Sequence, residues 1–344
     1  MADLFANADF SLPAGFDIIA SDEKLGPQIL SALAEIEERL SRAVTQTSKI
    51  ADVASRHLLN AGGKRVRPLL TLLAAAADGE INDAVIDAAV VVELTHLATL
   101  YHDDVMDDAP KRRGVDTAQN IWGNSVAILT GDLIFSRASL IVSELGQRPM
   151  AVQAQTFERL VLGQLFETTG PQEGEDILTH YIKVVEGKTG SLIAAAGSYG
   201  TILSGASESV VQMLARYGEL VGVAFQLADD VIDVTGQSKK SGKVPGTDLR
   251  EGVPTLPTIL LEQQAQSGDP EAQRVLELVR ADLTDDSALA TAVAELAAHP
   301  VTRRAWEIAY QWADDAIAAI EPLPESTAKS ALKSFAHAVV RREA

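Results

Sequence analysis

The chain has 344 residues, which is enough for a sizeable hydrophobic core in one large domain or in two. Its formal net charge of −19 excludes general attraction to nucleic acid or to anionic lipid as the main activity, because the long-range field repels polyanions. The absence of cysteine excludes disulfides, thiolate chemistry and cysteine-ligated zinc. No secretory signal and no apolar run of membrane-spanning length are recognised, so we expect a cytoplasmic protein.

The predicted elements are helices throughout. Hydrophobic content of 47% with only 5% aromatic residues favours helix over sheet, and strand-like alternation is hardly found. In chain order, helical spacing of apolar residues is clearest at 25–44, 86–104, 151–167 and 301–320. We therefore predict an all-α fold of about a dozen helices, forming a single domain over 1–344.

Three segments are expected to lie outside the regular helices. Residues 1–24 are predicted to be a loosely ordered extension. An acidic connection is expected near Gly170, and the Gly-, Lys- and Ser-rich stretch from Thr235 to Pro257 is predicted to be one long loop. Such loops are often lids or binding loops, so this stretch is a candidate for contact with a ligand.

Two acidic groups with the same spacing each follow an apolar helical run. In a helix the first and last members of each group lie one turn apart on the same face. A single group is most simply explained as a solvated helix end, neutralised here by Lys111, Arg112 and Arg113. Two groups beside apolar sequence favour Mg²⁺, which takes one or two carboxylates together with water and phosphate oxygens. The groups are Asp103, Asp104 and Asp107 in HDDVMD, and Asp229, Asp230 and Asp233 in ADDVID.

A basic segment, GGKRVRP, places Lys64, Arg65 and Arg67 directly after two glycines. Glycine allows close approach of the backbone, and these side chains are suited to phosphate. Alone, the segment is equally well explained as a basic surface turn. Together with the two acidic groups, it indicates two phosphorylated ligands, one held by metal and one by cationic side chains.

Five motifs in order now resemble a known family closely: GGKRVRP, HLATLYHDDVMDDAPKRRG, GKTGSL, FQLADDVID and SGKVPGTDLREG. They look like those of the trans-isoprenyl diphosphate synthases, the polyprenyl synthetase family, and most like its bacterial long-chain members. The resemblance implies an isoprenoid-synthase-type helical bundle around a deep cavity, a homodimer, and three Mg²⁺ ions when substrate is bound. The implied reaction adds isopentenyl diphosphate to an allylic diphosphate such as farnesyl or geranylgeranyl diphosphate.

The resemblance also implies roles for individual residues. Asp103, Asp107, Asp229 and Asp233 would hold Mg²⁺, and Asp104 and Asp230 match the motif either as ligands or behind them. The implied contacts of isopentenyl diphosphate are Lys64, Arg67, His96 and Arg113. Those of the allylic diphosphate are Arg112, Lys188, Thr189, Gln226 and Lys243, with Lys188 and the aspartates Asp103, Asp107 and Asp229 grouped as catalytic. Val253 stands where the family often has Lys, so one cationic loop contact is missing.

The residues before the first acidic group bear on product length. Ala98 and Thr99 are small where short-chain relatives carry a bulky aromatic side chain, and Thr95 lies one turn further along the helix. One turn rises about 5.4 Å, roughly one isoprene unit, so an open wall favours a long product. The resemblance to the long-chain members implies about 30 to 50 carbons, for example for quinone side chains. A bulky residue from another helix, such as Phe166 or Leu162, would give a shorter product.

Alternatives to a long-chain synthase remain at this point. One is a geranylgeranyl or farnesyl diphosphate synthase. A terpene cyclase would not need the GGKRVRP segment or His96, and a non-catalytic subunit of a two-component synthase usually lacks intact acidic groups. A long apolar product would also draw the enzyme transiently to membranes.

Overall fold

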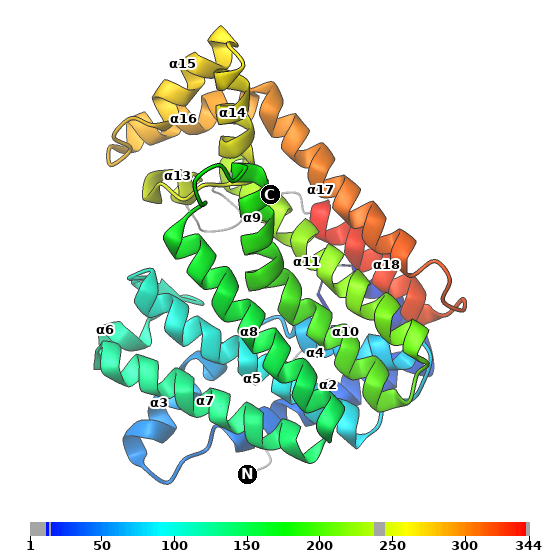
Figure 1. The fold of residues 1–344 in the computed structure, drawn as a ribbon. Helices are drawn as coiled ribbons and strands as arrows, with labels where there is room; N and C mark the ends of the chain where they lie inside the picture. Colours follow the sequence, from blue (N-terminus) through cyan, green and yellow to red (C-terminus); the bar gives the residue numbers. More distant parts are fainter. Residues whose placement is uncertain (1–11, 14, 237–244, 342–344) are drawn as a thin grey trace. The chain divides into compact units, whose positions relative to one another are not determined.

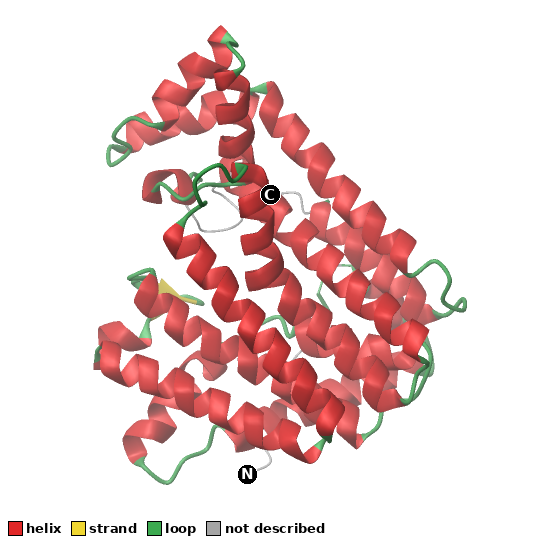
Figure 2. Cartoon of the chain, in the orientation of Figure 1, coloured by secondary structure: helices red, strands yellow, loops and turns green. Residues whose placement is uncertain are grey.

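The structure is a computed structural model that describes residues 12–13, 15–236 and 245–341 (Figure 1). Almost all of the described chain is helical (Figure 2), which confirms the all-α prediction. Apart from helices it contains one antiparallel hairpin of two short strands, β1 (Lys111–Arg112) and β2 (Val115–Asp116). The chain divides into two compact units, each assembled from segments that are distant in sequence.

The first unit comprises residues 1–156, 192–215 and 322–334. Its helix α5 contacts α2, α4, α6 and α7, and α7 also contacts α3. The helices that lie wholly within this unit are α1 (Asp17–Ala20), α2 (Leu25–Ala43), α3 (Lys49–Asn60), α4 (Val66–Ala76), α5 (Asp83–Met106), α6 (Ala118–Trp122) and α7 (Asn124–Glu144).

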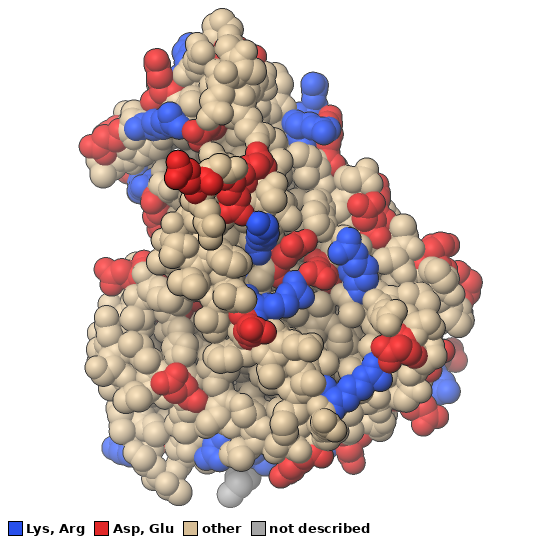
Figure 3. All heavy atoms as spheres, in the orientation of Figure 1, with Lys and Arg blue, Asp and Glu red and all other residues tan. Residues whose placement is uncertain are grey.

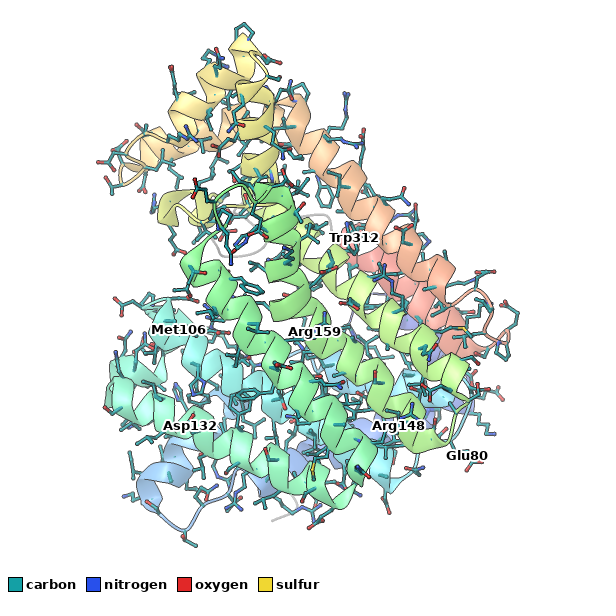
Figure 4. All side chains as sticks on the ribbon, viewed as in Figure 1. Glu80, Met106, Asp132, Arg148, Arg159 and Trp312 are labelled. Carbon is teal, nitrogen blue, oxygen red and sulfur yellow. The ribbon has the colours of Figure 1, made fainter. Side chains whose placement is uncertain are left out.

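Helix α5 is the central helix of the first unit. Asn82 caps its N-terminus by accepting a hydrogen bond of 3.0 Å from the backbone N–H of Val85. Buried side chains occur on nearly every side of the helix between Val85 and Tyr101, as expected for a helix surrounded by others. Because α5 ends at Met106, the first acidic motif lies at the C-terminal end of a core helix (Met106 is labelled in Figure 4).

The second unit comprises residues 157–191, 216–321 and 335–344. Within it, α14 contacts α9, α15 and α17, and α16 contacts α13, α15 and α17. Its helices are α9 (Ile177–Val185), the π-helix η1 (Glu186–Gly190), α13 (Thr247–Glu251), α14 (Leu256–Gln266), α15 (Pro270–Val279), α16 (Asp286–Ala298) and α17 (Pro300–Ala319). Four helices contribute residues to both units: α8 (Gln147–Thr169), α10 (Ser191–Ser204), α11 (Glu208–Thr235) and α18 (Thr327–Val340).

The structure adds detail to three expectations. The expected bundle of about a dozen helices is confirmed, and short helices such as α1, α6 and α13 also form in the connections of the described chain. Within 1–24, of which the structure describes 12–13 and 15–24, Phe16 just before α1 and Ile19 inside it are fully buried, and α1 packs on α2. The segment from Thr235 to Pro257 is not one continuous loop, since α13 forms inside it and α14 begins at Leu256.

Two helices of the described chain, α5 and α7, are long and apolar enough to cross a membrane, judged by length and composition alone. In α5 the apolar window is 67% buried, which is the pattern of a core helix, whereas the window in α7 is only 33% buried. Helix α7 therefore carries an apolar surface that its own unit does not cover.

Candidate active site

In the first acidic motif, the middle aspartate differs from the outer two. Asp103 is half-buried and Asp107 is exposed. Asp104 is 1% exposed, and its Oδ1 accepts a hydrogen bond of 2.6 Å from Arg112 Nε. Its other carboxylate oxygen is buried with no hydrogen-bond partner. Burial raises the pKa of Asp104 above its ordinary value, against the opposing effect of Arg112.

The β1–β2 hairpin brings two arginines to this motif. Its turn, Arg113–Gly114, has φ angles of 52° and 80°, as a two-residue turn with both central residues at positive φ requires. Arg112 reaches Asp104, while Arg113 Nη1 donates to the carbonyl of Leu58 at 2.8 Å and to that of Gly62. The hairpin therefore links the end of α5 to the GGKRVRP segment.

The second glycine of that segment, Gly63, admits two close-packed guanidinium groups. A Cβ on Gly63 would lie 2.5 Å from Arg65 Nη1 and 3.1 Å from Arg113 Nη2, and its φ is 155°. Arg65 is 8% exposed and pairs with Glu37 and, at 3.0 Å, with the buried Glu93 of α5. The charge of Arg65 is therefore balanced by carboxylates of its own unit.

Arg67 and His96 are in a different situation. Arg67 Nε is buried and has no hydrogen-bond partner. Burial, together with Arg113, lowers the pKa of Arg67, although Glu93 acts against this. Burial, followed by the charges of Arg67 and Arg113, lowers the pKa of His96 well below its usual range, so the imidazole is neutral at pH 7. An anion placed here would offset the mutual repulsion of these cations and give Arg67 a partner.

In the second unit, Asp230 occupies the position equivalent to Asp104. It is 4% exposed and accepts three hydrogen bonds, from the hydroxyl of Tyr181, from Gln226 Nε2 at 3.1 Å and from the backbone N–H of Leu256 at 3.1 Å. Burial raises the pKa of Asp230 to about 6, with those donors opposing the shift. Asp229 is exposed and Asp233 is half-buried, so the second motif also has an inward middle member.

A further carboxylate, Asp248 at the start of α13, lies beside the second motif. Its backbone N–H donates to Asp233 Oδ2 at 3.2 Å. Burial, then the charges of Asp233, Asp230 and Asp229, raise the pKa of Asp248 to about 7. Repulsion of this kind is relieved by a divalent cation, so the residues fit one. Within the described chain, no three acidic or histidine side chains already form a metal-binding group.

Lys188 and Thr189 lie in the π-helix η1, a form found often at functional sites. The helix packs tightly, since a Cβ on Gly163 of α8 would lie 2.8 Å from the backbone nitrogen of Lys188. Lys188 pairs with Glu167, and Thr189 Oγ1 donates to Gln226 Oε1 at 3.3 Å. One turn before Gly163 on α8, Arg159, labelled in Figure 4, pairs with Glu219.

The loop contacts predicted from sequence have mixed outcomes. Lys243 lies outside the described residues. Val253 is 39% exposed, and Arg250, the nearest cationic residue along the chain, pairs with Asp286 of α16. Arg250 is therefore bound within its own unit and does not fill the place of the missing lysine.

The three positions tied to product length differ in accessibility. Ala98 and Thr95 are fully buried, whereas Thr99, one turn before Asp103, is half-buried. Phe166, the candidate for a floor from another helix, packs on His180 with ring centroids 6.4 Å apart. Thr99 is thus the member of the three that reaches accessible surface.

The structure brings together two sets of predicted residues, one in each unit. Arg67, His96, Arg112 and Arg113 accompany the first acidic motif, and Thr189 and Gln226 accompany the second. Lys64 and Lys188 lie in the same units as these sets, Lys64 being exposed and Lys188 paired with Glu167. Sequence reasoning missed Glu93, Tyr181 and Asp248. Glu93 had a usable signal, since it is the single charged residue in the apolar run from Ala88 to Leu100.

An all-α fold with two aspartate motifs at the ends of long apolar helices, and with buried cations beside the first, defines a prenyltransferase. The comparison with protein families gives the same result, because the polyprenyl synthetase model matches residues 48–296. The chain belongs to this family.

Individual relatives span nearly the whole chain. Nonaprenyl diphosphate synthase of Mycobacterium tuberculosis is 42% identical, over 96% of this chain and 97% of its own. The crystal structure of geranylgeranyl pyrophosphate synthase from Corynebacterium glutamicum, complexed with calcium and isoprenyl diphosphate, matches with a TM-score of 0.83 at 39% identity, covering 93% and 98%. Decaprenyl diphosphate synthase from Rhodobacter capsulatus matches with a TM-score of 0.83 at 32% identity, covering 95% and 99%.

Proposed function

We propose that this chain is an all-trans-polyprenyl diphosphate synthase, which adds isopentenyl diphosphate repeatedly to an allylic diphosphate. The observation that carries the proposal is the basic set beside the first acidic motif. Arg67 has a buried Nε without a partner, and His96 is held neutral among arginines, seven residues before Asp103. Such a set fits a second diphosphate, which a condensing enzyme needs and a cyclase does not.

The outer aspartates are proposed to hold Mg²⁺, namely Asp103, Asp107, Asp229 and Asp233. Bound Mg²⁺ stabilises negative charge on a departing pyrophosphate. In our proposal Arg112, Lys188, Thr189 and Gln226 orient the allylic diphosphate, and Lys64, Arg67, His96 and Arg113 orient isopentenyl diphosphate. Asp104 and Asp230 are proposed to position these groups, since both are buried and bonded within their own units.

A long product, about 30 to 50 carbons, is proposed because the chain resembles a nonaprenyl diphosphate synthase at 42% identity over almost its full length. A geranylgeranyl or farnesyl product is the second candidate, favoured by the similarity to a geranylgeranyl pyrophosphate synthase. The deciding experiment incubates the purified chain with farnesyl diphosphate, isopentenyl diphosphate and Mg²⁺ and measures product length. Arrest at 15 or 20 carbons would refute the long-chain proposal, and no turnover by the single chain would indicate a subunit of a two-component enzyme.

The metal assignment is tested by isosteric substitutions. Asp103→Asn and Asp229→Asn are expected to lower kcat by about 100-fold or more while circular dichroism stays unchanged, because a charge that stabilises the transition state is lost. Asp108→Asn is the matched control, since Asp108 is exposed next to the first motif, and Asn tolerates its φ of 47°. Near-normal turnover by either motif variant would contradict the assignment.

We further propose a cytoplasmic homodimer with at most transient membrane association. The support is the exposed face of α7, where Ile128, Leu129 and Leu140 are 42%, 65% and 57% exposed. Their neighbours on this face are mostly serines. A second copy of the chain is the occupant that the family resemblance favours for this face.

A further inference from the structure

A layer of three hydrogen-bonded polar side chains crosses the core of the first unit. Gln153 Nε2 of α8 donates to Thr95 Oγ1 of α5 at 2.9 Å, and the hydroxyl of Tyr199 of α10 donates to Gln153 Oε1 at 2.7 Å. Thr95 in turn donates to the carbonyl of Val91 at 2.8 Å. Thr95 and Tyr199 are fully buried, and Gln153 is 7% exposed.

The layer lies at a defined depth below the first acidic motif. Thr95 is eight residues before Asp103 on α5, which corresponds to about 12 Å along the helix. Thr99, halfway between them, is half-buried, whereas Thr95 and Val92 beyond it are fully buried. The accessible surface on this side of α5 therefore ends between Thr99 and the layer.

A growing prenyl chain that extends along this wall meets the layer after about two isoprene units, each roughly one helical turn in length. A hydrocarbon cannot replace either hydrogen bond of Gln153, so its passage leaves buried polar groups without partners, which is unfavourable. Both bonds join side chains, and a rotamer change of Gln153 alone breaks them. The layer therefore acts as a gate and not as a fixed floor, because a prenyl chain can pass it once the two hydrogen bonds of Gln153 are broken.

We propose that the layer formed by Thr95, Gln153 and Tyr199 gauges product length, with Gln153 as the gate. This inference rests on the proposed function as a prenyl diphosphate synthase. Condensations on primers of 5 or 10 carbons occur before the chain reaches Gln153. Those on primers of 15 carbons or more require the gate to open, so intermediates of 15 to 20 carbons accumulate in the unmodified enzyme.

The test uses Gln153→Ala, which removes both bonds and opens space, and Tyr199→Phe, which removes one bond at nearly constant volume. Product length is measured at equal extents of turnover, from dimethylallyl diphosphate and from farnesyl diphosphate. The quantity compared is the ratio of two rates of isopentenyl diphosphate addition, the rate with farnesyl diphosphate divided by the rate with dimethylallyl diphosphate. In Gln153→Ala we expect this ratio to rise by roughly fivefold, because one net hydrogen bond changes a rate by about that factor. Tyr199→Phe should shift the same ratio in the same direction by less.

Tyr101→Phe is the matched control. Tyr101 is a fully buried tyrosine of α5 whose hydroxyl donates to the carbonyl of Ala54, away from the layer. Its loss should lower thermal stability without changing the ratio.

An unchanged ratio in both Gln153→Ala and Tyr199→Phe, or the same change in Tyr101→Phe, overturns the inference while leaving the synthase proposal intact. If the unmodified enzyme condenses isopentenyl diphosphate with neither primer, the proposed function itself fails. If Gln153→Ala does not fold, Tyr199→Phe and Gln153→Leu, which fills the site with apolar atoms, decide the question by the same ratio.

Discussion

Aspartate has two proposed roles in the acidic motifs. The outer aspartates are the proposed metal ligands, and the middle aspartates are buried and hold neighbouring groups in position. Asp104 bonds to Arg112, and Asp230 accepts from Tyr181, Gln226 and Leu256. Through Asp230, helices α9 and α11 and the start of α14 are joined at one carboxylate. This connection fixes the helix that carries Asp229 and Asp233, the proposed metal ligands, so we regard Tyr181 as a positioning residue.

Tyr181→Phe tests this role. Removing a donor to a buried carboxylate should cost about 1.5 to 3 kcal/mol of stability and raise the Mg²⁺ concentration needed for half-maximal turnover. Tyr217→Phe serves as the control because Tyr217 is another buried tyrosine of the same unit. A lower Tm with an unchanged Mg²⁺ dependence would reduce Tyr181 to a purely structural residue.

His96 gives a prediction on pH dependence. Its pKa in the folded protein is lowered, through burial and then through the nearby arginines, whereas the unfolded chain has the ordinary value near 6.5. The stability that neutral His96 confers is therefore fully present above pH 6.5 and is lost as the pH falls below it, because the unfolded state then binds the proton first.

The measurement compares urea unfolding of the wild type and of His96→Gln at pH 7.5 and 5.5. The variant should lose less stability over this interval. In addition, adding inorganic pyrophosphate should raise the pKa of His96 in an NMR titration, because an anion offsets the arginine charges. An identical pH dependence of the two proteins would show that His96 is not held neutral.

For individual residues, the sequence was informative where the candidate site residues lie together in a short motif. The aspartates, Arg67, Arg112 and His96 could be selected because their spacing is contained in one helix or turn. Tyr181 and Asp248 could not be selected, because their importance depends on helices and connections that meet Asp230 or Asp233 only after folding. Gln153 was missed for the same reason.

Among the elements, η1 shows how a local irregularity positions a side chain. The segment Glu186–Gly190 forms a π-helix, and two glycines, Gly163 and Gly187, let α8 and η1 approach through their backbones. The turn that carries Lys188 is therefore held by backbone contact, which leaves the lysine side chain available for Glu167 or for a ligand.

Gly163→Ala should disturb this arrangement. Its Cβ would lie 2.8 Å from the nitrogen of Lys188 and 3.0 Å from Gly187 Cα, and backbone atoms cannot move aside cheaply. We expect a loss of about 1 to 3 kcal/mol in unfolding free energy together with a lower kcat. Thr168→Ala, at an exposed position of the same helix, should change stability by less than about 0.5 kcal/mol. A stable and fully active Gly163→Ala would contradict the proposed role of this contact.

The helices themselves were largely predictable, because apolar periodicity records which face of each is buried. What the pattern did not show was the interruption of connections by short helices. Helix α13, with five residues between Gly246 and Gly252, is too short to leave a periodic signal, and its two glycine caps suggested a loop. The division into two units was also hidden, since it falls inside helices α8 and α11.

For the whole molecule, the charged surface affects solubility, whereas the exposed apolar side chains of α7 indicate a site of interaction. On the face shown in Figure 3, acidic and basic side chains are interspersed among uncharged ones, in line with a net charge of −19. Such a surface keeps the protein soluble and repels polyanions. The exposed leucines and isoleucine of α7 depart from this pattern, and large apolar patches usually mark interaction sites.

Leu129→Glu tests the proposal that α7 forms the surface between two copies. Leu129 is the most exposed of the three apolar residues, and a buried carboxylate without a partner would strongly oppose association. Sedimentation velocity should show the wild type with the mass of a dimer and the variant with that of a monomer. Tyr310→Ser, at an exposed aromatic residue of α17, should leave the dimer intact. A monomeric wild type, or a Leu129→Glu variant that still dimerises, would mean that the apolar face of α7 has another occupant.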